Sequence, residues 1–235
     1  ANNYAALAPG DSKIMCESLV KKAWALMVQG KDEEALRLLD EALLLYPKKP
    51  DGNGGSQALW QDDLTMLGEP WREIHWLRGW ASIRLDKNGQ AEQELARMEK
   101  IGEKYHLGPE RFTAILKYTR HLRAMIEAAA GNEDEAIEEV KGILDYGARL
   151  NYWITYYNQS FFHCELIRLL IRRERYDEAA REIEKAAAFN PRYPPLLWLR
   201  LRLADRTGEG AESAGRLLRD VLGQNAAMKP PSILE

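Results

Sequence analysis

The stretch GKDEEALRLLDEALLLYP, from Gly30 to Pro47, sets the pattern of the whole chain. A turn residue and acidic residues come first, and Ala35 is followed four positions later by Leu39. A second small residue, Ala42, comes three positions after that, and proline ends the stretch. Apolar residues at intervals of three and four predict an amphipathic helix, and Pro47 cannot continue one.

The same order of residue types returns four more times along the chain. The copies are Asp86–Met98, Gly131–Ile143, Glu174–Pro191 and a weaker one at Thr207–Leu222. Each follows another stretch with helical apolar periodicity: residues 18–29, 71–85, 110–130, 151–173 and 194–206. No segment shows sustained strand-like alternation, so we expect no sheet. The repeating unit is a helix, a turn and a second helix.

These units resemble the tetratricopeptide repeat (TPR) family, in which small residues mark helix crossings and proline follows the second helix. The residues that carry the resemblance are Gly79, Trp198, Pro47, Pro191 and the repeated alanines Ala35, Ala91, Ala136, Ala179 and Ala214. Only the last two alanines are about one 34-residue period apart. The resemblance implies an all-α, right-handed helix–turn–helix solenoid of about five degenerate hairpins.

The longer spacings between the repeated alanines predict longer first helices in some units and one insertion. The first helices of the third and fourth units are expected to reach about 20 residues, or about 30 Å. An insertion at 47–70 separates the first two units; we expect a loop over Pro47–Gly55 and a short helix over Ser56–Leu67. Residues 13–223 should form one superhelical domain, with loose ends at 1–12 and 224–235.

The resemblance also implies that the first helix of each unit lines a concave groove that binds a peptide. Carried onto this sequence, the groove positions are Trp24, Met27, Trp76, Trp80, Tyr118, His121, Met125, Phe161 and Arg168, with Val20, Ile83, Cys164, Leu199 and Leu203 beside them. Val20 and Trp24 stand where one TPR subgroup has a lysine and an asparagine that clamp a carboxylate, so that activity is not expected. An aromatic and apolar groove suits an apolar or amphipathic peptide segment.

The tryptophans leave a second interpretation open. The chain has seven, and exposing Trp24, Trp76 and Trp80 together would forgo on the order of 10 kcal/mol of burial energy. These rings could therefore pack on one another or on the insertion, could be covered by the tail KPPSILE, or could pair with a second copy in a homodimer. The prediction is a protein-interaction scaffold or adaptor; an accessory or regulatory domain of a longer enzyme or sensor is the alternative.

Other features give no sign of chemistry. Net charge is −3, with 46% hydrophobic and 29% charged residues, so neither a nucleic-acid partner nor membrane insertion is expected. A single Glu-x-x-His, Glu103 to His106, is too little for a di-iron site. Cys16 and Cys164 are expected to be free thiols, and the protein is expected not to be an enzyme and to need no cofactor or metal. The expected compartment is the cytoplasm, with a periplasmic or exported protein as the alternative if an N-terminal segment has been removed. The arginines between Arg168 and Arg219 could bind phosphate or an acidic partner, although acidic residues are almost as numerous there.

Overall fold

The structure is a computed structural model that describes residues 12–45, 48–50, 56–58, 69–104, 109–150 and 156–208, together with 212, 215, 216 and 219. Two compact units divide the chain, Ala1–Leu122 and Arg123–Glu235, and the division falls inside a single helix. The predicted single cooperative domain over 13–223 stays a prediction.

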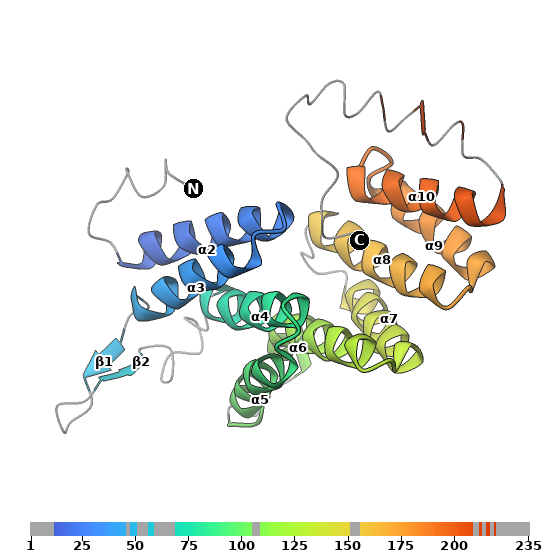
Figure 1. Ribbon diagram of the computed structural model, residues 1–235. Helices are drawn as coiled ribbons and strands as arrows, with labels where there is room; N and C mark the ends of the chain where they lie inside the picture. The colour runs from blue at the N-terminus through green and yellow to red at the C-terminus, as the bar shows by residue number, and fades with distance from the viewer. Residues whose placement is uncertain are drawn as a thin grey trace. The chain divides into compact units, whose positions relative to one another are not determined.

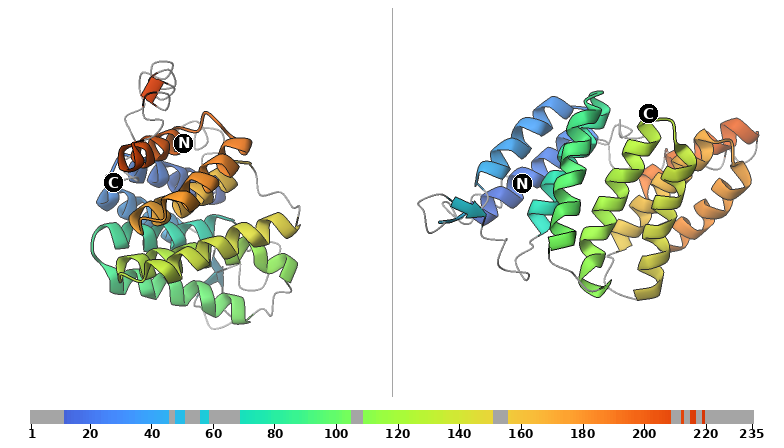
Figure 2. Two further views of the ribbon diagram at one scale, coloured as in Figure 1. Left: turned by 90° about the vertical axis from the view of Figure 1, so that its right-hand side faces the viewer. Right: turned by 90° about the horizontal axis from the view of Figure 1, so that it is seen from below.

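Consecutive helices pair as hairpins within the described residues (Figure 1). The first unit contains α2 (Ser12–Val28) with α3 (Asp32–Leu45), then α4 (Glu69–Arg84) with α5 (Asn88–Lys104). Helix α6 (Pro109–Ala129) runs from the first unit into the second. The second unit continues with α7 (Glu133–Leu150), α8 (Tyr156–Arg172) with α9 (Tyr176–Phe189), and α10 (Pro194–Thr207). Figure 2 shows the antiparallel pairs α2–α3 and α8–α9 from two further directions.

The repeated small residues lie where the sequence predicts close helix packing. Ala35, Ala91, Ala136 and Ala179 are fully buried, as are the large residues Leu39 and Met98 that follow. Pro194 occupies the first turn of α10, in agreement with the predicted helix start. Helix α6 has 21 residues, so the predicted extra length of the third unit is confirmed, whereas α8 of the fourth unit has 17 residues. The fifth alanine, Ala214, and most of the predicted helix around it lie outside the described residues.

One shared turn closes every described hairpin. The turn residue has a positive φ each time: Gly30 (+74°), Asp86 (+56°), Gly131 (+89°), Glu174 (+56°) and Gly208 (+78°). In the first four turns its N–H bonds to the carbonyl three residues back, and the next N–H reaches five residues back, as in Lys31 to Leu26. This is the Schellman arrangement, which satisfies the last carbonyls of a helix. It therefore fixes one residue frame for comparing all units, and we name positions by their distance from this turn residue.

In two of the five turns the residue with positive φ is not glycine but Asp86 or Glu174. Glycine adopts this left-handed conformation more readily than a residue with a side chain. Replacing Glu174 by glycine is therefore expected to raise the free energy of unfolding by about 0.5–1 kcal/mol. Chemical denaturation measures this change, with Glu174→Ala as the matched variant that keeps a Cβ. If Glu174→Gly were less stable than Glu174→Ala, the left-handed turn would be wrong.

The insertion differs from its prediction. Lys48–Pro50 (β1) and Ser56–Ala58 (β2) form an antiparallel pair in which Lys49 lies opposite Gln57. The expectation of no sheet is thus wrong here, and so is the predicted helix at Ser56–Ala58; residues 59–67 lie outside the described part. The physical reason is visible in the connecting sequence DGNGG, since Asp-Gly and Asn-Gly favour the tight turns of β-hairpins.

The two cysteines behave as predicted. Cys16 and Cys164 are free thiols, each at most 2% exposed. Burial, with Glu17 close by, raises the pKa of Cys16 to about 11. Burial likewise raises the pKa of Cys164 well above its usual value. Both side chains therefore act as small apolar core residues and not as reactive thiolates.

Candidate functional site

The predicted groove residues fall into two sets when sorted by burial. Five are buried: Met27, Trp76, Trp80, Tyr118 and His121. Four are only partly buried: Trp24, Met125, Phe161 and Arg168. Every buried member belongs to the first unit.

In the first unit the aromatic rings of α2, α4 and α6 pack directly on one another. Trp76 stacks on Trp80 with ring centroids 5.7 Å apart, and Trp24 lies 5.6 Å from each of them. Tyr118 lies 4.8 Å from Trp76. Such offset and tilted contacts stabilise a packed cluster beyond the area that they bury. We call Trp24, Trp76, Trp80, Tyr118 and His121 the aromatic cluster.

A buried hydrogen bond fixes the centre of this cluster. The indole Nε1–H of Trp76 donates to Nδ1 of His121 over 2.8 Å, and His121 is fully buried. Because Nδ1 accepts, the imidazole proton sits on Nε2. The His121 ring also meets Trp80 edge-on, with centroids 5.7 Å apart. The bond satisfies Nε1 of Trp76 and Nδ1 of His121 in an otherwise apolar contact.

The partly buried groove residues of the second unit lie on α6 and α8. A guanidinium nitrogen of Arg168 lies 3.4 Å from the sulfur of Met125, and the same group pairs with Glu165 over 2.9 Å. Phe161 meets Phe162 edge-on at 5.2 Å. Partial burial leaves part of each of these side chains open to a partner.

The common frame shows which repeat position each residue holds. Six residues before the turn residue stand Trp24, Trp80, Met125, Arg168 and Arg202 in units one to five. Four of the nine predicted groove residues belong to this row: Trp24, Trp80, Met125 and Arg168. The two from the first unit, Trp24 and Trp80, are aromatic. Arginines hold the same position in the last two hairpins. The row therefore changes chemistry along the chain, from aromatic to basic.

A buried histidine–glutamate pair recurs inside two hairpins. His75 of α4 bonds through Nδ1 to Glu94 of α5 over 2.5 Å, and His163 of α8 bonds in the same way to Glu182 of α9, also over 2.5 Å. Each histidine stands eleven residues before its turn residue and each glutamate eight after it. The third hairpin also has an acid at this position, Glu139, held by Arg123 over 2.9 Å. Each of these side-chain pairs connects the two helices of one hairpin.

Both glutamates have pKa values below the ordinary one. Burial opposes the ionisation of Glu94, but hydrogen bonding and charge from His75 and Arg78 outweigh burial and lower its pKa. For Glu182, burial is likewise outweighed, here by His163 and Lys185. A carboxyl group whose pKa falls on folding stabilises the folded state above its unfolded pKa. That stabilisation is lost as pH falls through the folded pKa.

We therefore expect the protein to lose stability steadily as pH falls below about 4.5, the ordinary glutamate value. Replacing Glu94 by glutamine should lower the free energy of unfolding at pH 7 by about 1–3 kcal/mol. The same variant should flatten the acid limb of the stability curve. Urea denaturation from pH 7 to pH 3 measures both effects. An exposed match, Glu92→Gln, should leave the curve as it is, and an unchanged acid limb in Glu94→Gln would refute the linkage.

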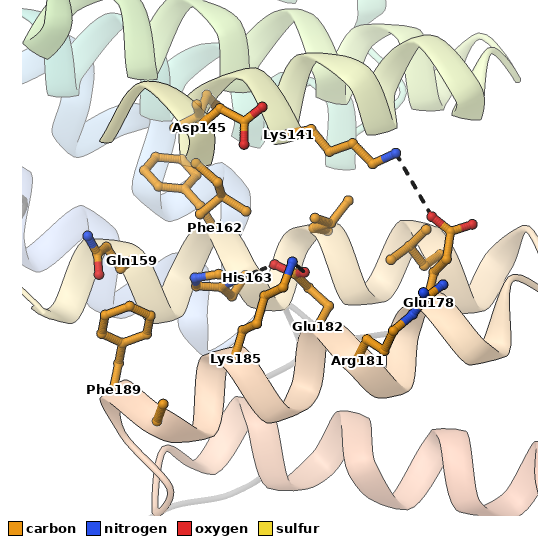
Figure 3. A pocket seen from close by; sticks show the side chains of 15 residues that line it. Lys141, Asp145, Gln159, Phe162, His163, Glu178, Arg181, Glu182, Lys185 and Phe189 are labelled. Carbon is orange, nitrogen blue, oxygen red and sulfur yellow. Dashed lines mark hydrogen bonds and ion pairs between the residues drawn. The ribbon is translucent and has the colours of Figure 1, made fainter. Parts of the chain in front are cut away.

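A cavity of about 860 Å³ is lined by residues of α7, α8 and α9 (Figure 3). Phe162, Leu166 and Leu170 line it from α8, and the His163–Glu182 pair forms part of its wall. Lys141 and Glu178 approach across it to 4.0 Å. Phe189 stacks on His163 and is 41% exposed. The cavity thus has an apolar floor and a charged rim.

The common frame shows how the residues at this cavity differ from those of the second hairpin. Leu166 stands eight residues before its turn residue, where the second hairpin has Arg78. Arg78 forms salt bridges with Asp40 of α3 and with Glu94 of α5, so its guanidinium spans the corresponding gap. A leucine cannot reach both neighbouring helices, and the space is left open in the second unit.

Sequence reasoning missed the pairs His75–Glu94 and His163–Glu182 and the cavity. A signal was present, because histidine and glutamate are separated by 19 residues in both pairs. No group of three or more potential metal ligands occurs among the described residues. In the described part of the chain, no helix is both long and apolar enough to span a membrane.

No protein-family model matches the chain, and no curated protein matches it either. Solved structures do match it, and two of them are similar to this chain over most of its length. Both show nearly identical TPR-like repeats of a Podosopora anserina protein designated a kinesin light chain, one of them a point variant. The TM-scores are 0.52 and 0.51 at 17% sequence identity, covering 92% and 94% of this chain and 98% and 100% of the others. The protein therefore has the predicted fold class, an all-α TPR-like helical-hairpin repeat.

Proposed function

We propose that the protein is a protein-interaction scaffold or adaptor that binds an apolar or amphipathic segment of a partner protein. The observation that carries the proposal is the partial exposure of Trp24 on a rigid aromatic base. Trp24 lies 5.6 Å from both Trp76 and Trp80, which are 6% and 2% exposed. A large ring held in one orientation loses little conformational entropy when it binds.

The nine predicted groove residues take two different roles in this proposal. Met27, Trp76, Trp80, Tyr118 and His121 support the binding surface of the first unit by filling the space behind it. Trp24 is the residue there that a partner contacts. In the second unit Met125 and Phe161 supply apolar contact, and Arg168 beside them orients a partner's polar groups. A few such anchors carry most of the energy of a protein interface.

This role needs neither catalysis nor a cofactor. The energy comes from burying apolar side chains of the partner, which the repeat fold suits because its first helices present successive rows of side chains. Nucleic acid is not the proposed partner, since the net charge of the chain is −3.

Selection of binders from a displayed library of amphipathic helical peptides, against the full chain, tests this function. We expect enrichment of peptides with aromatic or large aliphatic residues on one face. Their affinity should fall at least tenfold on Trp24→Ala or Phe161→Ala.

Phe189→Ala is the matched control, because it removes an exposed ring from the second helix of a hairpin. Affinity that falls for Phe189→Ala but not for Trp24→Ala or Phe161→Ala would move the site to the α7–α9 cavity and contradict the groove. A library that yields no saturable binder would contradict the scaffold role itself.

A further inference from the structure

Four arginines of the second unit hold only two repeat positions. Arg168 and Arg172 on α8 stand six and two residues before the turn residue Glu174. Arg202 and Arg206 on α10 stand at the same distances before the turn residue Gly208. Because α8 and α10 are in contact, equal positions on the two helices bring these side chains to one surface.

All four arginines line one cavity of about 390 Å³. Glu174 is the acidic residue in its lining, and Tyr176 places a phenol there. Four guanidinium groups against one carboxylate give the lining a clear excess of positive charge. A cavity of this kind concentrates anions from solution.

The surrounding carboxylates satisfy the arginines on the α8 side only in part. Arg168 pairs with Glu165 over 2.9 Å and Arg172 with Glu133 over 2.8 Å, and neither acid lines the cavity. Nε of Arg168 is buried and meets no hydrogen-bond acceptor among the described residues. On the α10 side, Arg202 and Arg206 are both exposed. The cavity therefore holds guanidinium N–H groups from two helices at its wall.

We infer that this cavity is a binding site for a phosphate-class dianion, either free or carried as a phosphate monoester. A phosphate group offers several oxygens that accept paired N–H groups from more than one guanidinium, and its negative charge is complementary to the positive excess in the lining. A single carboxylate offers two oxygens and one charge. Arg168, Arg202 and Arg206 bind the anion, Arg172 supports them from its pair with Glu133, and Glu174 opposes binding by repulsion.

The anion site and the proposed function share Arg168, but they rest on different observations, the arginine-lined cavity and the partial exposure of Trp24. Their test variants are separate, because Trp24 lies in the first unit and Arg202 and Arg206 are not among the predicted groove residues. Loss of peptide binding on Trp24→Ala would leave the anion site intact, and loss of phosphate binding on Arg202→Gln/Arg206→Gln would leave peptide selection unaffected.

Titration of the full chain with inorganic phosphate at constant ionic strength tests the site, followed by NMR of the arginine Nε–H signals. We expect saturable shifts that chloride does not produce. Arg202→Gln/Arg206→Gln should weaken binding at least tenfold. Glu174→Gln should tighten it severalfold by removing the repelling charge.

The matched control is Arg200→Gln, which removes the same charge from α10 but from an arginine that pairs with Glu184 over 2.9 Å and does not line the cavity. It should bind phosphate like the parent. O-phosphoserine binding more tightly than inorganic phosphate would assign a phosphate carried on a partner; equal or weaker binding would assign the free anion. Shifts that are the same with chloride, or an unchanged affinity in the double variant, would overturn the inference.

Discussion

Replacing Trp80 by alanine is expected to lower the free energy of unfolding by about 3–5 kcal/mol. Trp80 is 2% exposed and touches the rings of Trp24, Trp76 and His121. Truncation would leave a cavity that these rings cannot close, since each is held by a further contact of the cluster. Such a loss is a large part of the 5–15 kcal/mol typical of a folded domain.

Trp24→Ala provides the comparison within the same cluster. Trp24 is only partly buried, so its removal should cost clearly less, about 1–2 kcal/mol. Guanidinium denaturation followed by circular dichroism gives both values without relying on tryptophan emission. Equal losses in the free energy of unfolding for Trp80→Ala and Trp24→Ala would contradict the assignment of Trp80 to the core and Trp24 to the surface.

Replacing Gly79 by alanine is expected to destabilise the protein by about 1–3 kcal/mol, although alanine favours helices more than glycine does. A Cβ at Gly79 on α4 would lie 2.6 Å from both terminal carbons of Leu122 on α6. Leu122 is fully buried, so its side chain would have to repack within the core to make room for a Cβ. The close approach of α4 and α6 therefore requires a residue without a side chain.

Gly89→Ala is the matched control for this close approach. Gly89 lies in α5, and a Cβ there would meet nothing within 4 Å. The substitution should be neutral, or stabilising by up to about 1 kcal/mol. Thermal unfolding of both variants measures the contrast. A stabilising Gly79→Ala would contradict the packing of Leu122 against α4.

The repeated hairpins could be predicted from the sequence because local features specify them. Alanines at crossings, glycine or acidic turns, and helix-ending prolines all act within a few residues, and Ala35, Ala136 and Pro194 lie where these features predict. Gly79 is a further example, since the glycine position of the resembled family coincides with a real close approach. Local features did not reveal the short pairing of β1 with β2, because the connecting glycines also suit a loop.

Which groove residues are buried could not be predicted, because helical periodicity places a side chain on a face but does not say what covers it. Trp76 and Trp80 share the groove face with Trp24, yet α6 contributes Tyr118 and His121 against them. Leu166 in the lining of the α7–α9 cavity stands at the repeat position of the helix-spanning Arg78. That correspondence becomes visible only after the turn residues have fixed a common frame.

The rings of Trp76 and Trp80 are buried in the first unit, and Trp24 is the partly buried tryptophan that packs on them. Labelling with 5-fluorotryptophan tests this arrangement most directly, with ¹⁹F signals assigned by Trp24→Phe, Trp76→Phe and Trp80→Phe and a soluble paramagnetic probe added. We predict strong broadening of the Trp24 signal and little broadening of the Trp76 and Trp80 signals. Equal broadening of all three signals would show an open aromatic groove and contradict the burial of Trp76 and Trp80.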